Sequence, residues 1–222
     1  FKYIMDVKEV YGIGPKLSVE LRRHYNIKTI NTLRHYVRKI PDILTDQQKK
    51  GLKYHSKISK KITKKDADRH IKYIKKCIPS ITPAGSYRRC EKWIGDIDLI
   101  TTSKISTVVK KLDNYIVDVL SCGDDMFHGI GRLPNTSNYR RIDIIKTTKE
   151  QLPFALLYLT GDMVQNITMR QKAKRIKYTL SQYGLYDNIK KKYIHGIKNE
   201  KDIFDFLKIK YKSPEQRIHP KV

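Results

Sequence analysis

Residues 85–99 read GSYRRCEKWIGDIDL, and this stretch says more about the fold than any other part of the chain. Asp96 and Asp98 are two residues apart in an alternating pattern that predicts a β-strand, so both carboxylates project from one face. Two neighbouring carboxylates repel each other unless a cation lies between them. The pair therefore predicts a strand that carries a cation site.

A later segment supplies a third carboxylate. Residues 141–145 read RIDII, a second alternating pattern in which Asp143 shares a face with Arg141 and Ile145. Carboxylate oxygens suit Mg²⁺ or Mn²⁺, and three carboxylates can hold two such ions about 3.5–4 Å apart. For Asp96 and Asp98 alone, a surface strand with solvated aspartates is the better interpretation. Together with Asp143 on the later strand and the glycine-serine turn upstream, the two aspartates are better interpreted as part of a catalytic site.

The turn before the first strand contributes groups that bind phosphate. Gly85 allows backbone N–H groups to approach an anion, and the Ser86 hydroxyl adds another donor. Arg89 can offer two parallel hydrogen bonds to phosphate oxygens. The stretch thus combines a phosphate cradle with a metal site.

The composition indicates a polyanionic partner. The chain has 47 Lys and Arg against 22 Asp and Glu, a net charge of +25. This excess does not distinguish nucleic acid from an anionic membrane or an acidic protein. No apolar run approaches the roughly 20 residues that span a bilayer. The 3 cysteines form no metal-binding pair, and such a low count suits a reducing intracellular compartment.

The spacing of apolar residues changes twice along the chain. Helical spacing dominates residues 1–66 and continues to about residue 82, strand patterns follow from Ile94, and helical spacing returns after Leu152. This order predicts an α+β catalytic unit flanked by helical modules. We expect the histidines of the N-terminal region, such as His55 and His70, to lie at the surface, and Trp93 to be packed.

The motifs resemble those of the family X DNA polymerases, with DNA polymerase beta the nearest member. Residues 85–99 resemble the family's nucleotidyltransferase motif, and residues 140–143 resemble its segment with the third catalytic aspartate. Residues 158–161, which read YLTG, and residues 202–214 are similar as well. Asn166 to Arg170 resemble the family's helix that reads the minor groove of the new base pair. Residues 10–54 resemble its helix-hairpin-helix region, in which Gly12 and Gly14 permit a tight hairpin between two helical segments. The resemblance thus covers nearly the whole chain.

The resemblance implies a DNA polymerase beta-like nucleotidyltransferase palm. A helix-hairpin-helix DNA-binding subdomain would span residues 1–66, the catalytic palm residues 67–149, and a fingers-type subdomain that binds the nascent base pair residues 150–222. The implied function is template-directed filling of short gaps in DNA repair, with two Mg²⁺ ions that Mn²⁺ can replace. Gapped or primer-template DNA and dNTPs would be the partners, without a membrane and with the chain as a monomer.

The resemblance also implies roles for individual residues. Catalysis and the binding of both metal ions fall to Asp96, Asp98 and Asp143. Nucleotide binding falls to Lys64, Gly85, Ser86, Arg89, Gly95, Tyr158, Gly161 and Asn166. DNA binding falls to Gly12, Gly14, Lys16, Arg141 and Arg170. A Na⁺ or K⁺ ion would be held by the backbone carbonyls of Lys8, Val10 and Ile13.

Several features depart from the family pattern. Few residues precede Gly12, so we expect this chain to lack the lyase module of DNA polymerase beta, although a longer parent protein could carry it. Leu159 replaces a phenylalanine beside the sugar, which leaves ribonucleotide exclusion open. Ile145 replaces an arginine that can pair with the third aspartate. Met163 and Ile167 replace polar side chains near the nascent base pair.

Two other functions stay open at this level. A non-catalytic DNA-binding scaffold is disfavoured because all three carboxylates are present. Another nucleotidyltransferase, such as a terminal or RNA-tailing transferase, would share the motif but would not need the hairpin or a template-reading helix. We expect an intracellular protein, in a nucleus or in a cytoplasmic viral compartment, with the choice between them undecided.

Overall fold

The structure is a computed structural model that describes residues 7–218 of the chain. The chain divides into two units between Lys60 and Lys61. The predicted boundary after residue 66 falls inside a helix, α5, which spans Lys64–Cys77 and packs into the second unit. Among residues 7–218, no helix is both long and apolar enough to cross a membrane.

The first unit is helical, and its helices begin at residues suited to capping. Its elements are α2 (Pro15–Tyr25), α3 (Ile30–Lys39), the 3-10 turn η1 (Pro41–Ile43) and α4 (Asp46–Ile58). Thr29 caps α3, and Thr45 with Gln48 forms a capping box at α4. The unit has its own core of buried aliphatic side chains: Val7, Val10, Ile13, Leu21, Ile27, Leu33, Leu44 and Leu52.

The second unit is built on a five-stranded sheet with the order β2-β4-β7-β6-β5. The strands are β2 (Thr82–Pro83), β4 (Ile97–Thr101), β5 (Ile116–Cys122), β6 (Met126–Arg132) and β7 (Tyr139–Lys146). β4 and β7 run parallel, whereas every other neighbouring pair is antiparallel. A separate two-stranded sheet pairs β1 (Ile62–Thr63) with β3 (Trp93–Ile94).

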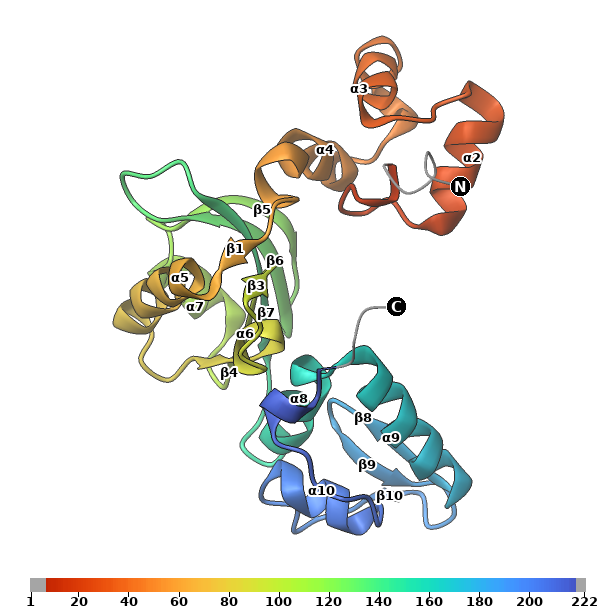
Figure 1. The fold of residues 1–222 in the computed structure, drawn as a ribbon, viewed down its shortest axis with the longest axis vertical. Coiled ribbons are helices and arrows are strands. Elements are labelled where there is room, and N and C mark those ends of the chain that lie inside the picture. Colours follow the sequence, from red (N-terminus) through yellow and green to blue (C-terminus); the bar gives the residue numbers. More distant parts are fainter. Residues whose placement is uncertain (1–6, 219–222) are drawn as a thin grey trace. The chain divides into compact units, whose positions relative to one another are not determined.

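Two helices cover one face of the large sheet (Figure 1). α5 and α7 (Ile105–Lys111) pack their apolar sides against inward-facing side chains of β4 and β7, such as Ile97, Leu99 and Ile142. Because side chains alternate along a strand, the intervening residues of β4 and β7 lie on the opposite face. The short helix α6 (Gly85–Arg88) follows β2 and contacts β4.

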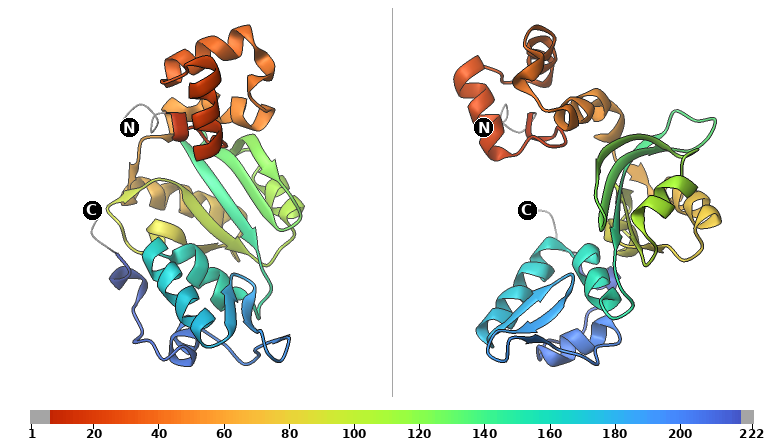
Figure 2. Two further views of the ribbon diagram at one scale, coloured as in Figure 1. Left: turned by 90° about the vertical axis from the view of Figure 1, so that its right-hand side faces the viewer. Right: turned by 180° about the vertical axis from the view of Figure 1, so that it is seen from behind.

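The C-terminal part surrounds a second core. Its elements are α8 (Leu152–Thr160), α9 (Met163–Arg175), β8 (Tyr178–Ser181), β9 (Gly184–Asp187), β10 (Lys192–Tyr193), α10 (Glu200–Phe206) and the 3-10 turn η2 (Pro214–Gln216). Figure 2 shows α9 beside the β8–β9 hairpin. This three-stranded sheet was not predicted, because its strands are short and the segment gave mixed signals.

A buried ion network joins α6 to the C-terminal part. Glu200 accepts hydrogen bonds from Arg88 at 2.5 Å and from Arg217 at 2.7 Å. Arg88 also donates to the Thr160 hydroxyl at the end of α8, at 2.7 Å. Arg217 is wholly buried, so Glu200 compensates a charge that has no access to water.

Three expectations about single residues are wrong. His70 is buried, and its Nδ1 lies 2.6 Å from the Tyr115 hydroxyl. Burial holds the pKa of His70 at about 4, which keeps the ring neutral. His55 is buried as well. Trp93 is 48% exposed instead of packed, because the two-residue strand β3 turns its side chain outward.

Candidate active site

Three carboxylates meet on the face of the sheet that α5 and α7 leave open. The parallel register pairs Asp98 with Asp143, so both side chains project in the same direction from neighbouring strands. Asp96 immediately precedes β4. One carboxylate oxygen from each residue lies within 4.8 Å of the others. The three predicted ligands are therefore brought together by strand pairing.

Cationic side chains lie directly against this cluster. Arg141 donates a short hydrogen bond to Asp96, and its Nε lies 3.3 Å from Asp143 Oδ2. His128 Nδ1 lies 2.9 Å from Asp143 Oδ1. Arg141 thus bridges two of the three carboxylates in this structure.

The electrostatics of the cluster favour an additional cation. Burial, together with the charges of Asp96 and Asp143, raises the pKa of Asp98 to about 8. Burial also raises the pKa of Asp96, although Arg141 opposes the shift. Burial, together with repulsion between the carboxylates, therefore favours the protonated acids unless a metal ion neutralises the negative charge. Hard oxygen donors in this arrangement fit Mg²⁺ or Mn²⁺.

Gly85 packs directly against the cluster. Its φ is +60°, and a Cβ at this position would overlap the Asp98 carboxylate. A glycine is therefore required both by the backbone conformation and by the close approach. Ser86 is the next residue of α6. Gly95 lies at an open point, where a Cβ would meet no atom within 4 Å.

A cleft of about 380 Å³ contains several of the predicted nucleotide-binding residues. Its lining comes from α8, α9 and the end of α6: Arg89, Tyr158, Leu159, Gly161, Asp162, Met163, Asn166, Ile167 and Arg170. Asn166 donates a hydrogen bond of 2.7 Å to the carbonyl of Tyr158, and Arg170 lies over the Tyr158 ring at 5.1 Å. These contacts give the cleft a fixed polar wall.

Arg89 and Lys64 both have protein partners in this structure. Arg89 donates from Nε to Glu91 at 3.0 Å, with further short hydrogen bonds to Glu91 and to the Thr160 carbonyl. Lys64 begins α5 and lies over the Tyr87 ring at 5.0 Å. An incoming phosphate would compete with Glu91 for the Arg89 guanidinium.

The predicted hairpin lies in the first unit. Gly12 has φ of +84° and its carbonyl accepts a hydrogen bond of 3.0 Å from Gln48, whereas Gly14 caps α2 just before Pro15. Lys16 is therefore in the first turn of α2, where unpaired N–H groups favour an anion. Of the three carbonyls expected to hold a monovalent cation, that of Val10 accepts a hydrogen bond of 3.0 Å from the Ile13 N–H.

Sequence patterns missed His128 and Glu91. His128 lies on β6, a strand whose pattern is interrupted by Gly129 and Gly131. Both glycines make room for aromatic rings, since a Cβ would overlap Phe127 at one position and Tyr115 at the other. The contact of Glu91 with Arg89 is formed within one turn, and only the two-residue spacing of opposite charges could have indicated it.

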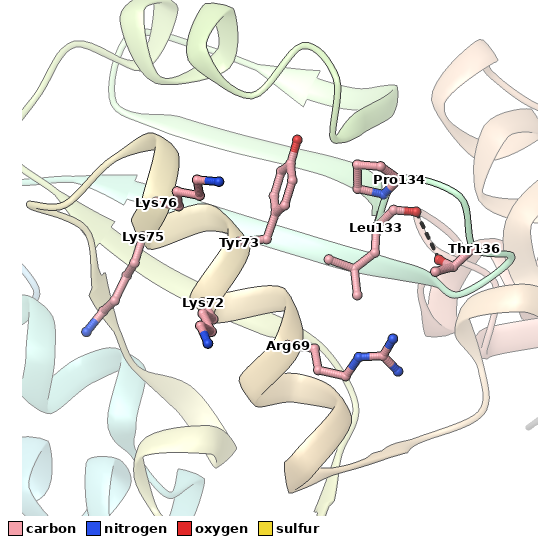
Figure 3. A pocket seen from close by; sticks show the side chains of 8 residues that line it. All are labelled: Arg69, Lys72, Tyr73, Lys75, Lys76, Leu133, Pro134 and Thr136. Carbon is pink, nitrogen blue, oxygen red and sulfur yellow. Dashed lines mark hydrogen bonds between the residues drawn. The ribbon is translucent and has the colours of Figure 1, made fainter.

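A larger groove of about 700 Å³ lies on the helical side of the sheet (Figure 3). It is lined by Arg69, Lys72, Tyr73, Lys75 and Lys76 of α5 and by Leu133, Pro134 and Thr136 after β6. Tyr73 packs against the core that fills the space between α5 and the sheet, on the face opposite the carboxylates. The groove therefore contains none of the candidate catalytic groups.

Comparison with known proteins gives a consistent picture. Two family profiles match: the DNA polymerase beta palm over residues 57–149 and the DNA polymerase beta thumb over residues 155–218. The chain is 26% identical to DNA polymerase lambda of Arabidopsis thaliana, covering 94% of this chain and 45% of that protein. It is 24% identical to DNA-directed DNA/RNA polymerase mu of Homo sapiens, covering 94% of this chain and 51% of that protein. The chain thus spans about half the length of these relatives.

Solved structures are similar over nearly the whole chain. A ternary P/T complex of Leishmania infantum polymerase beta superposes with a TM-score of 0.86 at 28% identity, covering 98% of both chains. A ternary gap complex of the same polymerase gives a TM-score of 0.87 at 28% identity, covering 97% of this chain and 89% of the other.

Proposed function

Because the chain belongs to the family X DNA polymerases, we propose that it is a template-directed DNA polymerase that fills short gaps during DNA repair. The reaction is in-line attack of a primer 3′-hydroxyl on the α-phosphate of a dNTP, with release of pyrophosphate. The observation that carries this proposal is the carboxylate triad beside a cleft lined by Asn166 and Arg170. A similar solved structure described as a gap complex supports the choice of substrate.

The carboxylates would hold two Mg²⁺ ions. Asp96 and Asp98 would bind both ions and Asp143 would bind the catalytic one; one carboxylate oxygen of each residue lies within 4.8 Å of the others. When bound, the ions lower the pKa of the attacking hydroxyl and neutralise the triphosphate. Asp143 accepts the proton of the 3′-hydroxyl or helps to remove it. Arg141, which donates to Asp96 in this structure, would contact the primer terminus.

The phosphates of the dNTP would be bound by α6 and its surroundings. At Gly85 the backbone N–H groups can approach a phosphate, and the Ser86 hydroxyl adds a donor. The Arg89 guanidinium can donate two parallel hydrogen bonds to phosphate oxygens when it is released from Glu91. Gly95 leaves open space for the triphosphate, and Lys64 adds positive charge. Catalysis by such an arrangement comes mainly from positioning and charge neutralisation.

The remaining parts of the substrate would be bound by the cleft. Tyr158 and Gly161 line the sugar, and Asn166 and Arg170 contact the minor-groove edges of the new pair and the template. Met163 is 72% exposed, so an apolar surface is available to pack against bases. Leu159 lines the same cleft, at the position where the family has a phenylalanine beside the sugar.

The first unit would bind the DNA backbone. The turn at Gly12 and Gly14 and the first turn of α2 offer N–H groups to a phosphate, and Lys16 adds charge. A Na⁺ or K⁺ ion at the carbonyls of Lys8, Val10 and Ile13 would complete the contact. We further propose a monomer that acts inside the cell, in a nucleus or in a cytoplasmic viral compartment.

The test is addition of one nucleotide at a one-nucleotide gap with Mg²⁺, each dNTP being supplied separately. Addition of only the complementary dNTP supports template-directed synthesis. Equal addition of all four dNTPs would identify a terminal transferase. DNA binding without any addition, with Mg²⁺ or with Mn²⁺, would identify a non-catalytic scaffold. The same primer on a longer single-stranded template serves as the control for gap preference.

A further inference from the structure

His128 lies beside the carboxylate cluster without being a candidate metal ligand. β6 and β7 are antiparallel, and their register places His128 directly opposite Asp143. The Nδ1 atom of His128 lies 2.9 Å from Asp143 Oδ1, and the side chains are 24% and 15% exposed. Residues directly opposite each other on one face are the closest side-chain pairs of a sheet.

We propose that His128 is a positioning residue that fixes the Asp143 carboxylate in the orientation that binds metal. Its Nδ1–H donates to Oδ1 of Asp143. This inference deepens the proposed function and rests on it, because it assigns Asp143 to a metal ion. His128 is not in the group of residues whose ligand atoms could hold a metal ion.

The surroundings of Asp143 explain why such a donor is needed. The other oxygen, Oδ2, lies 3.3 Å from the Arg141 Nε, and Arg141 also pairs with Asp96. Arg141 is on the same strand and would draw the carboxylate toward itself. Ile145, two residues along on the same strand, is apolar and offers no hydrogen bond. His128 therefore anchors Asp143 from the neighbouring strand.

The strand gives this anchor a fixed position. Phe127, the neighbour of His128, is fully buried in the core on the helical side of the sheet. Alternation then directs His128 to the open face, beside Asp143. The backbone of His128 is held in place because it is paired on both sides, with β5 and with β7. A carboxylate held in this way loses less freedom when it binds a metal.

Groups that orient a metal ligand typically contribute 10–100-fold to metal affinity or activity. We therefore expect His128→Leu to weaken Mn²⁺ binding by on the order of tenfold. His128→Asn should stay within about twofold of the wild type, because the asparagine Nδ2 is bonded to Cγ as the histidine Nδ1 is and keeps the donor.

The primary measurement is the dissociation constant of Mn²⁺, from electron paramagnetic resonance of the free ion, with the whole chain and without DNA or dNTP. His195→Leu, the same substitution at an exposed histidine, is the matched control. Circular dichroism and urea unfolding check that each variant is folded. The inference is overturned if His128→Leu binds as tightly as the wild type, if His128→Asn loses as much as His128→Leu, or if the wild type binds no Mn²⁺.

Kinetics supply a second readout. The His128→Leu variant should lose on the order of tenfold in kcat for single-nucleotide addition while KM for the dNTP changes little. A raised KM with unchanged kcat would contradict the assignment. If the wild type adds no nucleotide while the Mn²⁺ result holds, the polymerase proposal fails and the positioning role stands. If the wild type adds nucleotides but His128→Leu binds Mn²⁺ as tightly as the wild type, the polymerase proposal stands and the role of His128 is overturned.

Discussion

Stability in the absence of metal should fall as pH rises, and Asp98 is the reason. Its pKa in the folded chain is about 8, because burial and the charges of Asp96 and Asp143 disfavour the carboxylate. In the unfolded chain an aspartate titrates near pH 4, as an isolated side chain does. Between these two values the folded state keeps a proton that the unfolded state has lost. The contribution of Asp98 to stability is therefore largest below about pH 4 and decreases toward pH 8.

The size of the effect follows from one proton. A difference of one bound proton changes the free energy of unfolding by about 1.4 kcal/mol per pH unit. Asp98 is only half-buried, so water moderates the shift and we expect about 0.5–1 kcal/mol per pH unit. Asp98→Asn removes the titrating group. The wild type should thus lose stability relative to this variant as the pH rises.

The assay is urea unfolding between pH 5.5 and 7.5 in the presence of EDTA. The chain has a single tryptophan, and Trp93 lies in β3 three residues before Asp96, so its fluorescence reports on the unit that holds the site. Asp125→Asn, at an exposed aspartate paired with Lys146, is the control. Excess Mg²⁺ should remove the pH dependence. Equal pH slopes for the wild type and Asp98→Asn in EDTA would refute the electrostatic reasoning.

Three further results are expected. Gly85→Ala should abolish Mn²⁺ binding, because its Cβ would overlap the Asp98 carboxylate; unchanged affinity in a Mn²⁺ titration would disprove this. Glu200→Ala should lower the free energy of unfolding by about 3–5 kcal/mol, because Arg88 and the wholly buried Arg217 lose their partner; a loss under about 1 kcal/mol would contradict it. Affinity for gapped DNA, measured by fluorescence anisotropy, should fall steeply between about 50 and 200 mM salt, and a flat profile would exclude backbone binding.

The strands that carry the aspartates could be predicted because aliphatic and polar residues alternate around each aspartate. Both aspartates stand between two aliphatic residues, in Ile97-Asp98-Leu99 and Ile142-Asp143-Ile144, so each could be placed on a face before its partner was known. Their convergence also requires β4 and β7 to be parallel neighbours that pair the two residues, and the pattern of either strand alone does not identify its partner. The motif resemblance supplied that step.

The polar contacts around the triad could not be predicted. His128 lies on a strand in which Gly129 and Gly131 make room for neighbouring aromatic rings. These glycines interrupt the alternating pattern, so the strand and the face on which His128 lies could not be predicted. Arg89 was predicted to bind phosphate, and its contact with Glu91 became visible only in the folded turn. Such contacts depend on side-chain geometry in three dimensions, which spacing along the sequence does not determine.

The central claim is that the carboxylate triad performs templated nucleotide addition, and Asp143→Asn tests it most directly. The measurement is the rate of single-nucleotide addition at a gap with Mg²⁺, beside the Asp125→Asn control and with DNA affinity measured in parallel. We predict that Asp143→Asn keeps its DNA affinity and loses on the order of a hundredfold or more in rate, whereas the control is unchanged. A variant that still adds the complementary nucleotide at nearly the wild-type rate would contradict the account.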